Sequence, residues 1–387
     1  MKEKEIEKNN VGDSLNPNQE TTPDQKALDL TSKISEKQKT ATTEEDWQEI
    51  AKLFEELKAV YEPEKGMEAF EASLREQYEN QLDIMVRLGI TNILESGEFG
   101  IQGIDGKEYP EPTFEQVIKR IEVKKEMIEK KEKQGFTRLL LVPFGVKLEQ
   151  LTEAYKGSIL EHHKQGKLFT AKKDASDPNE KLIPLKLDEN NPLYVWDGYE
   201  KEELIYWPKE FSENHGGKTK KEILVERSQK NDVTSGWDII FVEDNPNIPR
   251  QGNEKTVGTR TQIDTKGSKV RNIMYTMPLN ETIPNPEEYL RALTKESKDP
   301  NSVFQGEQGM TPEDQLMYAI TYLEEHHQII DDYEGNGSIS YQIGGWFPAS
   351  GSVPGAYWYR DYSQAYMDWR DPRYRNVNCG VRPSVRI

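Results

Sequence analysis

Cysteine is almost absent from this sequence. The 387 residues include one cysteine, Cys379. A single thiol cannot build an internal disulfide framework or a metal site made of cysteine pairs. Low cysteine content is typical of a reducing compartment, although an exported protein with few cysteines would look the same.

Long apolar runs are also lacking. The most apolar stretch, residues 137–146, is far shorter than the roughly 20 residues that cross a bilayer as a helix. The charged first residues MKEKEIEKNN are not followed by an apolar h-region, so we expect no membrane span and no secretory signal. A cytoplasmic location and export by an unrecognised route both remain open.

Positive charge is in deficit, because the formal net charge is −18. Neutralising phosphates requires clustered lysine and arginine, so nucleic acid is not an expected partner. Hydrophobic residues make up 34% of the chain and charged residues 31%, which indicates a very polar protein. The length allows two or three domains.

The first part of the chain divides into two regions by composition. Residues 1–43 contain too few apolar side chains to offset the entropy of ordering, and we predict a disordered tail. Apolar spacing of three and four residues predicts a helical region at 44–135, with a break at Pro63 and Gly66. This region could pack as a three-helix unit on the rest of the chain, or it could drive oligomerisation as a coiled coil.

Residues 136–387 are predicted to form one mixed domain. We expect a buried strand at 137–146, a helix at 148–169, and strands near 193–196, 204–207 and 237–242. Residues 250–308 are polar and weakly patterned, and are interpreted as an exposed insertion. Thr311 and Pro312 are typical of the first residues of a helix, which we expect to continue to about Asp332.

Motifs for metal or phosphate chemistry are weak. The adjacent histidines at 162–163 and 326–327 would point to different faces of a helix. The stretch 214–219 lacks the full spacing of a phosphate-binding loop. Residues 331–337 concentrate oxygen ligands without the spacing of an EF-hand. We therefore predict no metal, no cofactor and no catalytic residue.

The segment after Glu334 differs from everything before it. It contains no lysine and no glutamate, and its six arginines and three aspartates give it a charge of +3. Ten aromatic residues lie between Tyr341 and Tyr374. Tyrosine, tryptophan and arginine with serine, glycine and asparagine are typical of a recognition surface. The alternative is an aromatic β core in a small domain.

Residues 381–387 alternate between apolar and polar side chains. Val381, Val385 and Ile387 would form one face, with Arg382 and Arg386 on the other. Period two predicts a half-buried strand. The stretch 338–343 is its expected partner.

The pieces GGWFPASG and NVNCGVRPSVRI carry a resemblance that covers about the last fifty residues. They resemble the end of the C-type lectin fold of formylglycine-generating enzymes and of the variable proteins of diversity-generating retroelements. In the retroelement family, adenines in this segment are randomised, so an asparagine codon can become Tyr, Asp, Ser, Arg, Gly or Cys but never Lys or Glu. The resemblance implies an α+β fold: a C-type lectin-like domain with insertions at 136–387 and a variable segment at about 340–380.

The resemblance also implies a binding protein that is not an enzyme. Formylglycine-generating enzymes use a pair of cysteines, and this chain has only Cys379. Trp346, Trp358, Trp369, Gly380, Val381, Val385 and Ile387 are expected to hold the scaffold. The predicted ligand-binding residues are Gly355, Tyr357, Tyr359, Arg360, Asp361, Tyr362, Ser363, Tyr366, Asp368, Arg370, Arg373, Tyr374, Asn376, Asn378 and Cys379.

The expected partner is a macromolecule, a protein rather than a sugar, because the surface is wide and nothing specifies a calcium-held saccharide. Two other functions remain open. One is a structural or assembly protein with a fixed ligand, which oligomerises through residues 44–135. The other is an enzyme of the sulfatase-modifying type, which the missing second cysteine disfavours.

Overall fold

A computed structural model describes residues 23–41, 43–172, 179–230, 232–247, 285–302, 304–335, 337–376 and 378–387. The chain forms two compact units, Met1–Leu74 and Arg75–Ile387. This division differs from the predicted boundaries at residues 43 and 135.

The first unit contains α1 (Pro23–Thr40) and most of α2 (Glu44–Arg87). Helix α1 contradicts the prediction of a disordered tail for its residues, while residues 1–22 lie outside the described ranges. Leu30 and Ile34 lie four residues apart and are buried, so a short apolar stripe is enough to pack this polar helix. Helix α2 also passes through Pro63 and Gly66, where a break was expected. A proline inside a helix costs about 3 kcal/mol, which the helix formers around it can offset.

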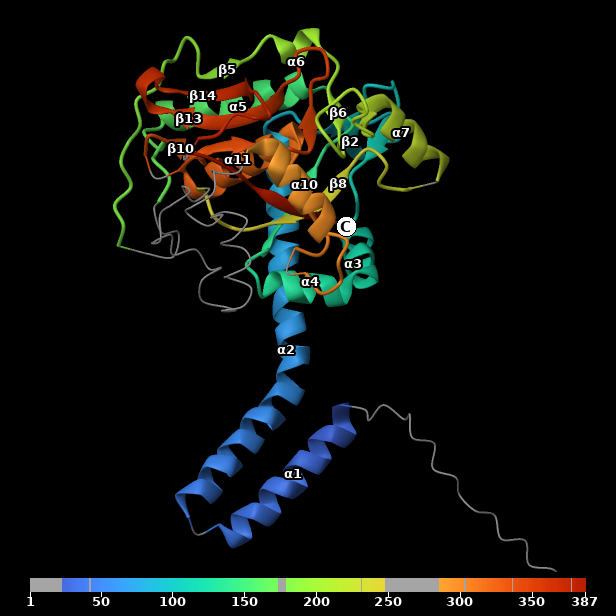
Figure 1. Ribbon diagram of the computed structural model, residues 1–387, viewed down its shortest axis with the longest axis vertical. Coiled ribbons are helices and arrows are strands. Elements are labelled where there is room, and N and C mark those ends of the chain that lie inside the picture. Colours follow the sequence, from blue (N-terminus) through green and yellow to red (C-terminus); the bar gives the residue numbers. More distant parts are fainter. Residues whose placement is uncertain are drawn as a thin grey trace, which may run out of the picture. The chain divides into compact units, whose positions relative to one another are not determined.

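The second unit mixes helices and strands (Figure 1). After α2, its helices are α3 (Phe114–Val123), α4 (Lys125–Glu132), α5 (Leu148–Lys164), α6 (Gly198–Lys201), α7 (Lys220–Gln229), α10 (Pro286–Glu296) and α11 (Pro312–His326). Its first nine strands are β1 (Asn92–Ile93), β2 (Phe99–Gln102), β3 (Glu108–Pro110), β4 (Arg138–Val142), β5 (Leu193–Val195), β6 (Ile205–Tyr206), β7 (Lys218–Thr219), β8 (Asp238–Val242) and β9 (Glu307–Gly309). The later strands are β10 (Asp332–Tyr333), β11 (Ile339–Tyr341), β12 (Gly345–Trp346), β13 (Val353–Tyr359), β14 (Gln364–Arg370), β15 (Cys379–Val381) and β16 (Pro383–Arg386).

These strands form four sheets. The largest has the order β15-β11-β13-β14-β5, with β10 beside β13. A four-stranded sheet has the order β4-β8-β16-β9, and the smaller ones have the orders β12-β6-β7 and β1-β2-β3. The predicted strands at 137–146, 193–196, 204–207 and 237–242 correspond to β4, β5, β6 and β8. The mixed helix and strand content of the predicted α+β class is confirmed.

Helix α11 is the buried centre of this unit. Its start matches the prediction: Thr311 accepts from the Asp314 N–H at 3.2 Å, its own N–H donates to the Asp314 carboxylate, and Pro312 is the first helical residue. The helix contacts α5, β4 and β13, and therefore packs against both of the larger sheets. It ends at His326 rather than Asp332, because His327 adopts a left-handed backbone with a φ of 59°.

The C-terminal strand pairs differently from the prediction. β16 lies between β8 and β9, and it is β15 that pairs with β11. Both faces of β16 are covered, since Ser384 is as buried as Val385, and Arg382, just before the strand, is also buried. Arg382 contacts Asp331 at 2.8 Å in the interior. The expected half-buried strand is thus a buried one whose arginines have buried acidic partners.

Two further expectations on helices need correction. The predicted helical region at 44–135 contains the strands β1–β3 and is interrupted again at Lys124, whose φ and ψ of −118° and 21° are not helical. The exposed insertion expected at 250–308 falls partly on residues 248–284, which lie outside the described ranges. Its later part contains α10, which buries Tyr289, Leu290 and Leu293 in an apolar cluster with Phe304.

Strand β4 lies at the edge of its sheet, and side chains of α2 form hydrogen bonds with its outer backbone groups. Gln81 donates to the Leu139 carbonyl and accepts from the Leu141 N–H, each at 2.9 Å. Gln77 makes the same pair of bonds to Thr137 and Leu139. The two amides therefore satisfy backbone groups that would otherwise form an open sheet edge. Within the described ranges, none of the helices combines the length and apolar character needed to cross a membrane.

Candidate ligand-binding surface

The β13–β14 hairpin carries most of the predicted binding residues. The two strands form seven antiparallel pairs, including Gly355 with Asp368 and Tyr357 with Tyr366. Successive side chains of a strand point to opposite faces. This register therefore places Gly355, Tyr357 and Tyr359 on the same face as Tyr366, Asp368 and Arg370.

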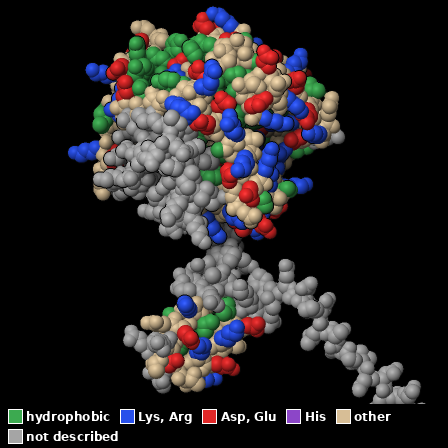
Figure 2. Space-filling view, viewed as in Figure 1, with side chains coloured by type: hydrophobic (Ala, Val, Ile, Leu, Met, Phe, Trp, Pro, Cys, Tyr) green, Lys and Arg blue, Asp and Glu red, His purple; other side chains and the backbone are tan. Residues whose placement is uncertain are grey.

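Neighbouring strands add tyrosines to this face. Tyr333 of β10 lies opposite Tyr359, and Tyr194 of β5 lies opposite Tyr366. We call Tyr194, Tyr333, Tyr357, Tyr359 and Tyr366 the tyrosine face. Its rings contact one another, with Tyr357 and Tyr366 stacked at 5.2 Å and Tyr333 edge-on to Tyr357 at 5.5 Å. Figure 2 shows hydrophobic side chains, a class that there includes tyrosine, gathered over the β13–β14 part of the molecule.

An open hollow of about 560 Å³ lies against this face. It is lined by Tyr333, Ile339, Tyr357, Tyr359, Asp368, Trp369, Arg370, Asp371, Tyr374 and Asn376. Six of these were predicted as ligand-binding residues: Tyr357, Tyr359, Asp368, Arg370, Tyr374 and Asn376. The volume is in the range of sites that hold one small ligand or an anchoring side chain of a partner.

A polar triangle lies within the hollow. Tyr357 donates from its hydroxyl to Asp368 at 3.3 Å, and Arg370 donates to the same hydroxyl at 3.2 Å and pairs with Asp368. The Arg370 guanidinium also lies over the Tyr357 ring, 5.4 Å from its centroid. Burial raises the pKa of the Tyr357 hydroxyl, so this group stays protonated. The triangle holds these three side chains in fixed positions at one end of the hollow.

Two arginines of the segment are fixed by ion pairs. Arg360 forms two bonds with Asp332, and Arg375 forms two with Glu288 at 2.7 and 2.6 Å. The Glu288 carboxylate also accepts from the N–H of Asn285, the residue that caps the start of α10. Planar two-bond pairs of this kind are geometrically specific. Arg375 therefore ties the segment after β14 to α10.

The fifteen predicted ligand-binding residues differ in their exposure. Asp361, Tyr362, Arg373 and Tyr374 are exposed, and Tyr362 and Tyr374 keep 59% and 47% of their surface. Tyr359, Arg360, Ser363, Tyr366, Asp368, Arg370, Asn376 and Asn378 are half-buried. Gly355, Tyr357 and Cys379 are buried.

Cys379 corrects the prediction. It is 1% exposed and pairs with Ile339 in the sheet, so it cannot contact a macromolecular ligand. Burial raises the pKa of its thiol, which leaves it a poor nucleophile. Gly355 is likewise covered, whereas Tyr357 reaches the hollow although most of its surface is buried.

Trp369 is the other correction. It was expected to hold the scaffold, but it is 43% exposed and lines the hollow. The other expected scaffold residues, Trp346, Trp358, Gly380, Val381, Val385 and Ile387, are buried as predicted. Because Asp368 and Arg370 point to the tyrosine face, alternation along β14 directs the Trp369 side chain to the other side of the strand. Its ring is 5.8 Å from that of Trp196.

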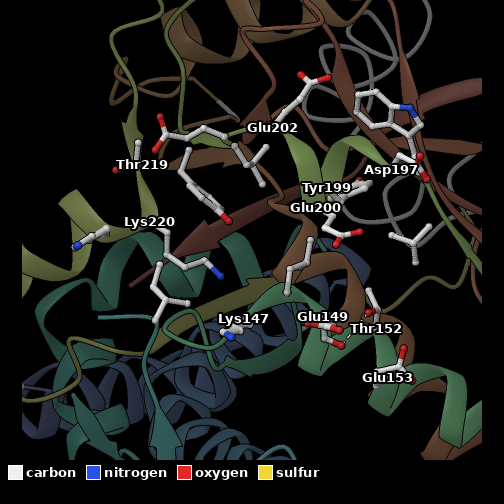
Figure 3. Close-up of a pocket in the computed structure, with 18 of the residues that line it drawn as sticks. Lys147, Glu149, Thr152, Glu153, Asp197, Tyr199, Glu200, Glu202, Thr219 and Lys220 are labelled. Carbon is white, nitrogen blue, oxygen red and sulfur yellow. Dashed lines mark hydrogen bonds between the residues drawn. The ribbon is translucent and has the colours of Figure 1, made fainter. Parts of the chain in front are cut away.

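Sequence reasoning missed a second hollow, of about 550 Å³. It lies among the start of α5, the α6 region and the start of α7 (Figure 3). Buried Lys220 is at its edge, 2.8 Å from buried Glu313, which also accepts from the Tyr206 hydroxyl at 2.7 Å. The residues come from elements far apart in the chain, and no local motif identifies them.

The histidine pairs do not form a metal site. His162 lies 2.9 Å from the Ser158 carbonyl, and His163 lies 3.2 Å from Glu189. In the part of the chain that the structure describes, no group of three or more His, Cys, Asp or Glu side chains is arranged to hold a metal ion.

Comparison of the chain with protein-family models, with curated proteins and with solved structures finds no match.

Proposed function

We propose that this chain is a ligand-binding variable protein with a C-type lectin scaffold, diversified by a retroelement to bind changing protein targets. The observation that carries the proposal is the β13–β14 register. It places Tyr357, Tyr359, Tyr366, Asp368 and Arg370 on one face, although they were selected only from composition and resemblance. Tyr374 and Asn376 border the same hollow.

The backbone hydrogen bonds between β13 and β14 explain how side chains on this face could vary without loss of the fold. Hydrogen bonds between β13 and β14 join backbone atoms, so side chains on the open face can change while the hairpin keeps its register. Tyrosine and tryptophan supply large rigid contact areas, and a few such anchors dominate the binding energy of most interfaces. Asp368, Asp371 and Arg370 would match the polarity of each target.

Oxidase chemistry of the sulfatase-modifying type has less support. That activity uses two cysteines, whereas this sequence has one, and Cys379 is buried with a raised pKa. A buried, protonated thiol is unreactive. These features favour binding over catalysis.

The test is made on DNA. The 3′ end of the gene and its flanking region would be sequenced across a population of source cells. We expect a nearby copy of the 3′ end beside a reverse transcriptase gene, and variation confined to codons where that copy has adenine. Those codons should include Tyr359, Tyr362 and Tyr374, and should spare Trp358. An invariant 3′ end without a repeat would overturn the proposal and favour a fixed ligand or an assembly role.

A further inference from the structure

The second hollow has mixed apolar and charged walls. Leu148, Val195 and Leu204 contribute apolar surface, and the Trp196 ring forms part of the wall. With about 550 Å³ it is in the size range of small-molecule sites. It is separate from the hollow of the tyrosine face, because the two share no lining residue.

Both lysine and carboxylate side chains line this hollow. Figure 3 shows Lys220 on one side, beside Thr219 at the start of α7, and Glu149, Glu153, Asp197 and Glu200 on the other, with Glu202 at the top of the view. Lys147, just before α5, lies on the lower wall. A ligand in this space would therefore meet both ammonium and carboxylate groups.

The basic end is held rigidly. Lys220 donates to the Val146 carbonyl at 2.6 Å and pairs with Glu313, and both side chains are buried. Lysine at the first turn of α7 also adds to the positive end of the helix dipole. The ammonium is thus fixed by the fold before any ligand enters.

On the acidic side, two of the carboxylates form no ion pair with another described residue. Among the described residues, Glu153 pairs with Lys156 and Asp197 with Lys201, but neither Glu149 nor Glu200 has an ion-pair partner. Glu149 comes from α5 and Glu200 from α6, and Figure 3 shows both on the side of the hollow away from Lys220. Two unpaired carboxylates on the same side can both contact one bound ammonium.

We propose that this hollow binds a small zwitterion whose ammonium and carboxylate are separated by an apolar stem, such as an ω-amino acid or a short peptide. The ammonium lies between Glu149 and Glu200. The carboxylate lies toward Lys147 and Lys220, and the stem contacts Leu148, Val195 and Leu204. This site goes beyond the proposed function, since it does not involve the tyrosine face.

The experiment is isothermal titration of the full-length chain with ω-amino acids of increasing length, namely β-alanine, 4-aminobutyrate, 6-aminohexanoate and 8-aminooctanoate. We expect an optimum length in this series. Hexylamine and hexanoate, each with one of the two charges, should bind at least tenfold more weakly than 6-aminohexanoate. Glu200→Gln and Lys147→Gln should each weaken binding of the best zwitterion by about tenfold, or about 1.4 kcal/mol.

Matched controls use exposed residues away from the hollow. Glu98→Gln and Lys119→Gln remove the same charges elsewhere on the surface and should leave the affinity unchanged. No heat of binding for any probe at millimolar concentration would overturn the proposal. Equal affinity for hexylamine and 6-aminohexanoate would also overturn it, as would variants of Glu200 and Lys147 that bind like the original chain. Lys220 is left intact, because its replacement would leave Glu313 buried without a partner.

Discussion

Arg386 lies in the interior between two aspartates. Its guanidinium is 2.6 Å from Asp238 and 2.7 Å from Asp314, and Asp238 also pairs with Arg227. Although burial opposes ionisation, Arg227 and Arg386 hold the pKa of Asp238 below its usual value. Burial raises the pKa of Asp314 to about 6, because Arg386 is shared with Asp238 and offsets the desolvation only in part.

Asp314 should make stability depend on pH in an unusual direction. Between about pH 4 and pH 6 the folded chain keeps the Asp314 proton while the unfolded chain has lost it. The unfolded state then binds fewer protons, so the free energy of unfolding falls as pH rises through this window and levels off above it. The contribution is on the order of 2–3 kcal/mol.

The measurement is urea unfolding of the original chain and of Asp314→Asn at several pH values from 4 to 7. Asparagine can still accept at the start of α11 but does not titrate, so the variant should gain stability relative to the original chain as pH rises. Asp361→Asn, at an exposed position, should run parallel to the original chain. Parallel curves for Asp314→Asn would show that Asp314 is ionised throughout this window.

At this scale, alternation in residues 381–387 correctly predicted a strand but not its burial. Period two separates two faces, and it cannot tell a solvated arginine from one with a buried acidic partner. The partners of Arg382 and Arg386 lie at 331, 238 and 314, far away in sequence. Cys379 was wrongly predicted to contact a ligand for the same reason. Its sequence neighbours are polar, although its own position in the strand is buried.

At the scale of elements, the β13–β14 hairpin and the segment after it contain tyrosines of two kinds, buried ones and exposed candidates for ligand contact. Tyr357 is 6% exposed and bonded to Asp368, whereas Tyr374 is 47% exposed. We expect Tyr357→Ala to lower the free energy of unfolding by about 3 kcal/mol, as other large truncations in cores do. Tyr374→Ala should change it by less than about 0.5 kcal/mol.

Chemical unfolding of both variants tests this assignment. For a target selected by binding to the original chain, Tyr374→Ala should also raise the Kd by about tenfold or more, the usual effect of removing an aromatic anchor. Tyr289→Ala, in the cluster under α10, is the matched core control. Strong destabilisation by Tyr374→Ala would place this residue in the core and contradict its role as a contact.

Strand β4 depends on glutamines of α2 for its hydrogen bonds. Gln81→Met keeps the size of the side chain but leaves the Leu139 carbonyl and the Leu141 N–H without this partner. A buried backbone group that loses its partner costs about 1–3 kcal/mol. We expect a loss of about 2–4 kcal/mol in thermal or urea unfolding, whereas the exposed Gln165→Met should be neutral. An unchanged free energy for Gln81→Met would mean that water replaces the amide.

Elements with strong local signals were predicted well. The capping residues of α11 and the apolar patterns of α5 and β4 are local, so the sequence is sufficient to find them. Helix α1 and the passage of α2 through Pro63 were missed, because packing and neighbouring helix formers override weak local preferences. The pairing of β16 with β8 and β9 depends on distant segments, which no local pattern specifies.

At the scale of the whole molecule, the boundary at Leu74 defines where the chain can be cut. Residues after it belong to the second unit: Lys131 forms a fully buried pair with Glu307 at 2.6 Å, and Arg120 bonds to Thr234 and pairs with Asp232. The predicted helical region at 44–135 therefore spans both units. An oligomerisation role can be tested only by removing its first part.

We expect a chain of residues 75–387 to keep the Tm of the original chain within about 3 °C. A chain of residues 136–387 should fail to fold, because Glu307 would be buried without its lysine, which costs about 3–5 kcal/mol. Differential scanning calorimetry measures the first outcome and circular dichroism the second. Light scattering of both longer chains tests the assembly role, which requires the original chain to be larger than a monomer and residues 75–387 to be monomeric.

One indole from each hollow takes part in a close ring pair. Trp369 lines the hollow of the tyrosine face, Trp196 lines the second hollow, and their rings are 5.8 Å apart at an angle of 40°. A ligand in either hollow would change the surroundings of one ring of this pair. We therefore expect occupation of either site to alter the intrinsic fluorescence of the chain, to which five other tryptophans also contribute, so that binding can be followed without an attached dye.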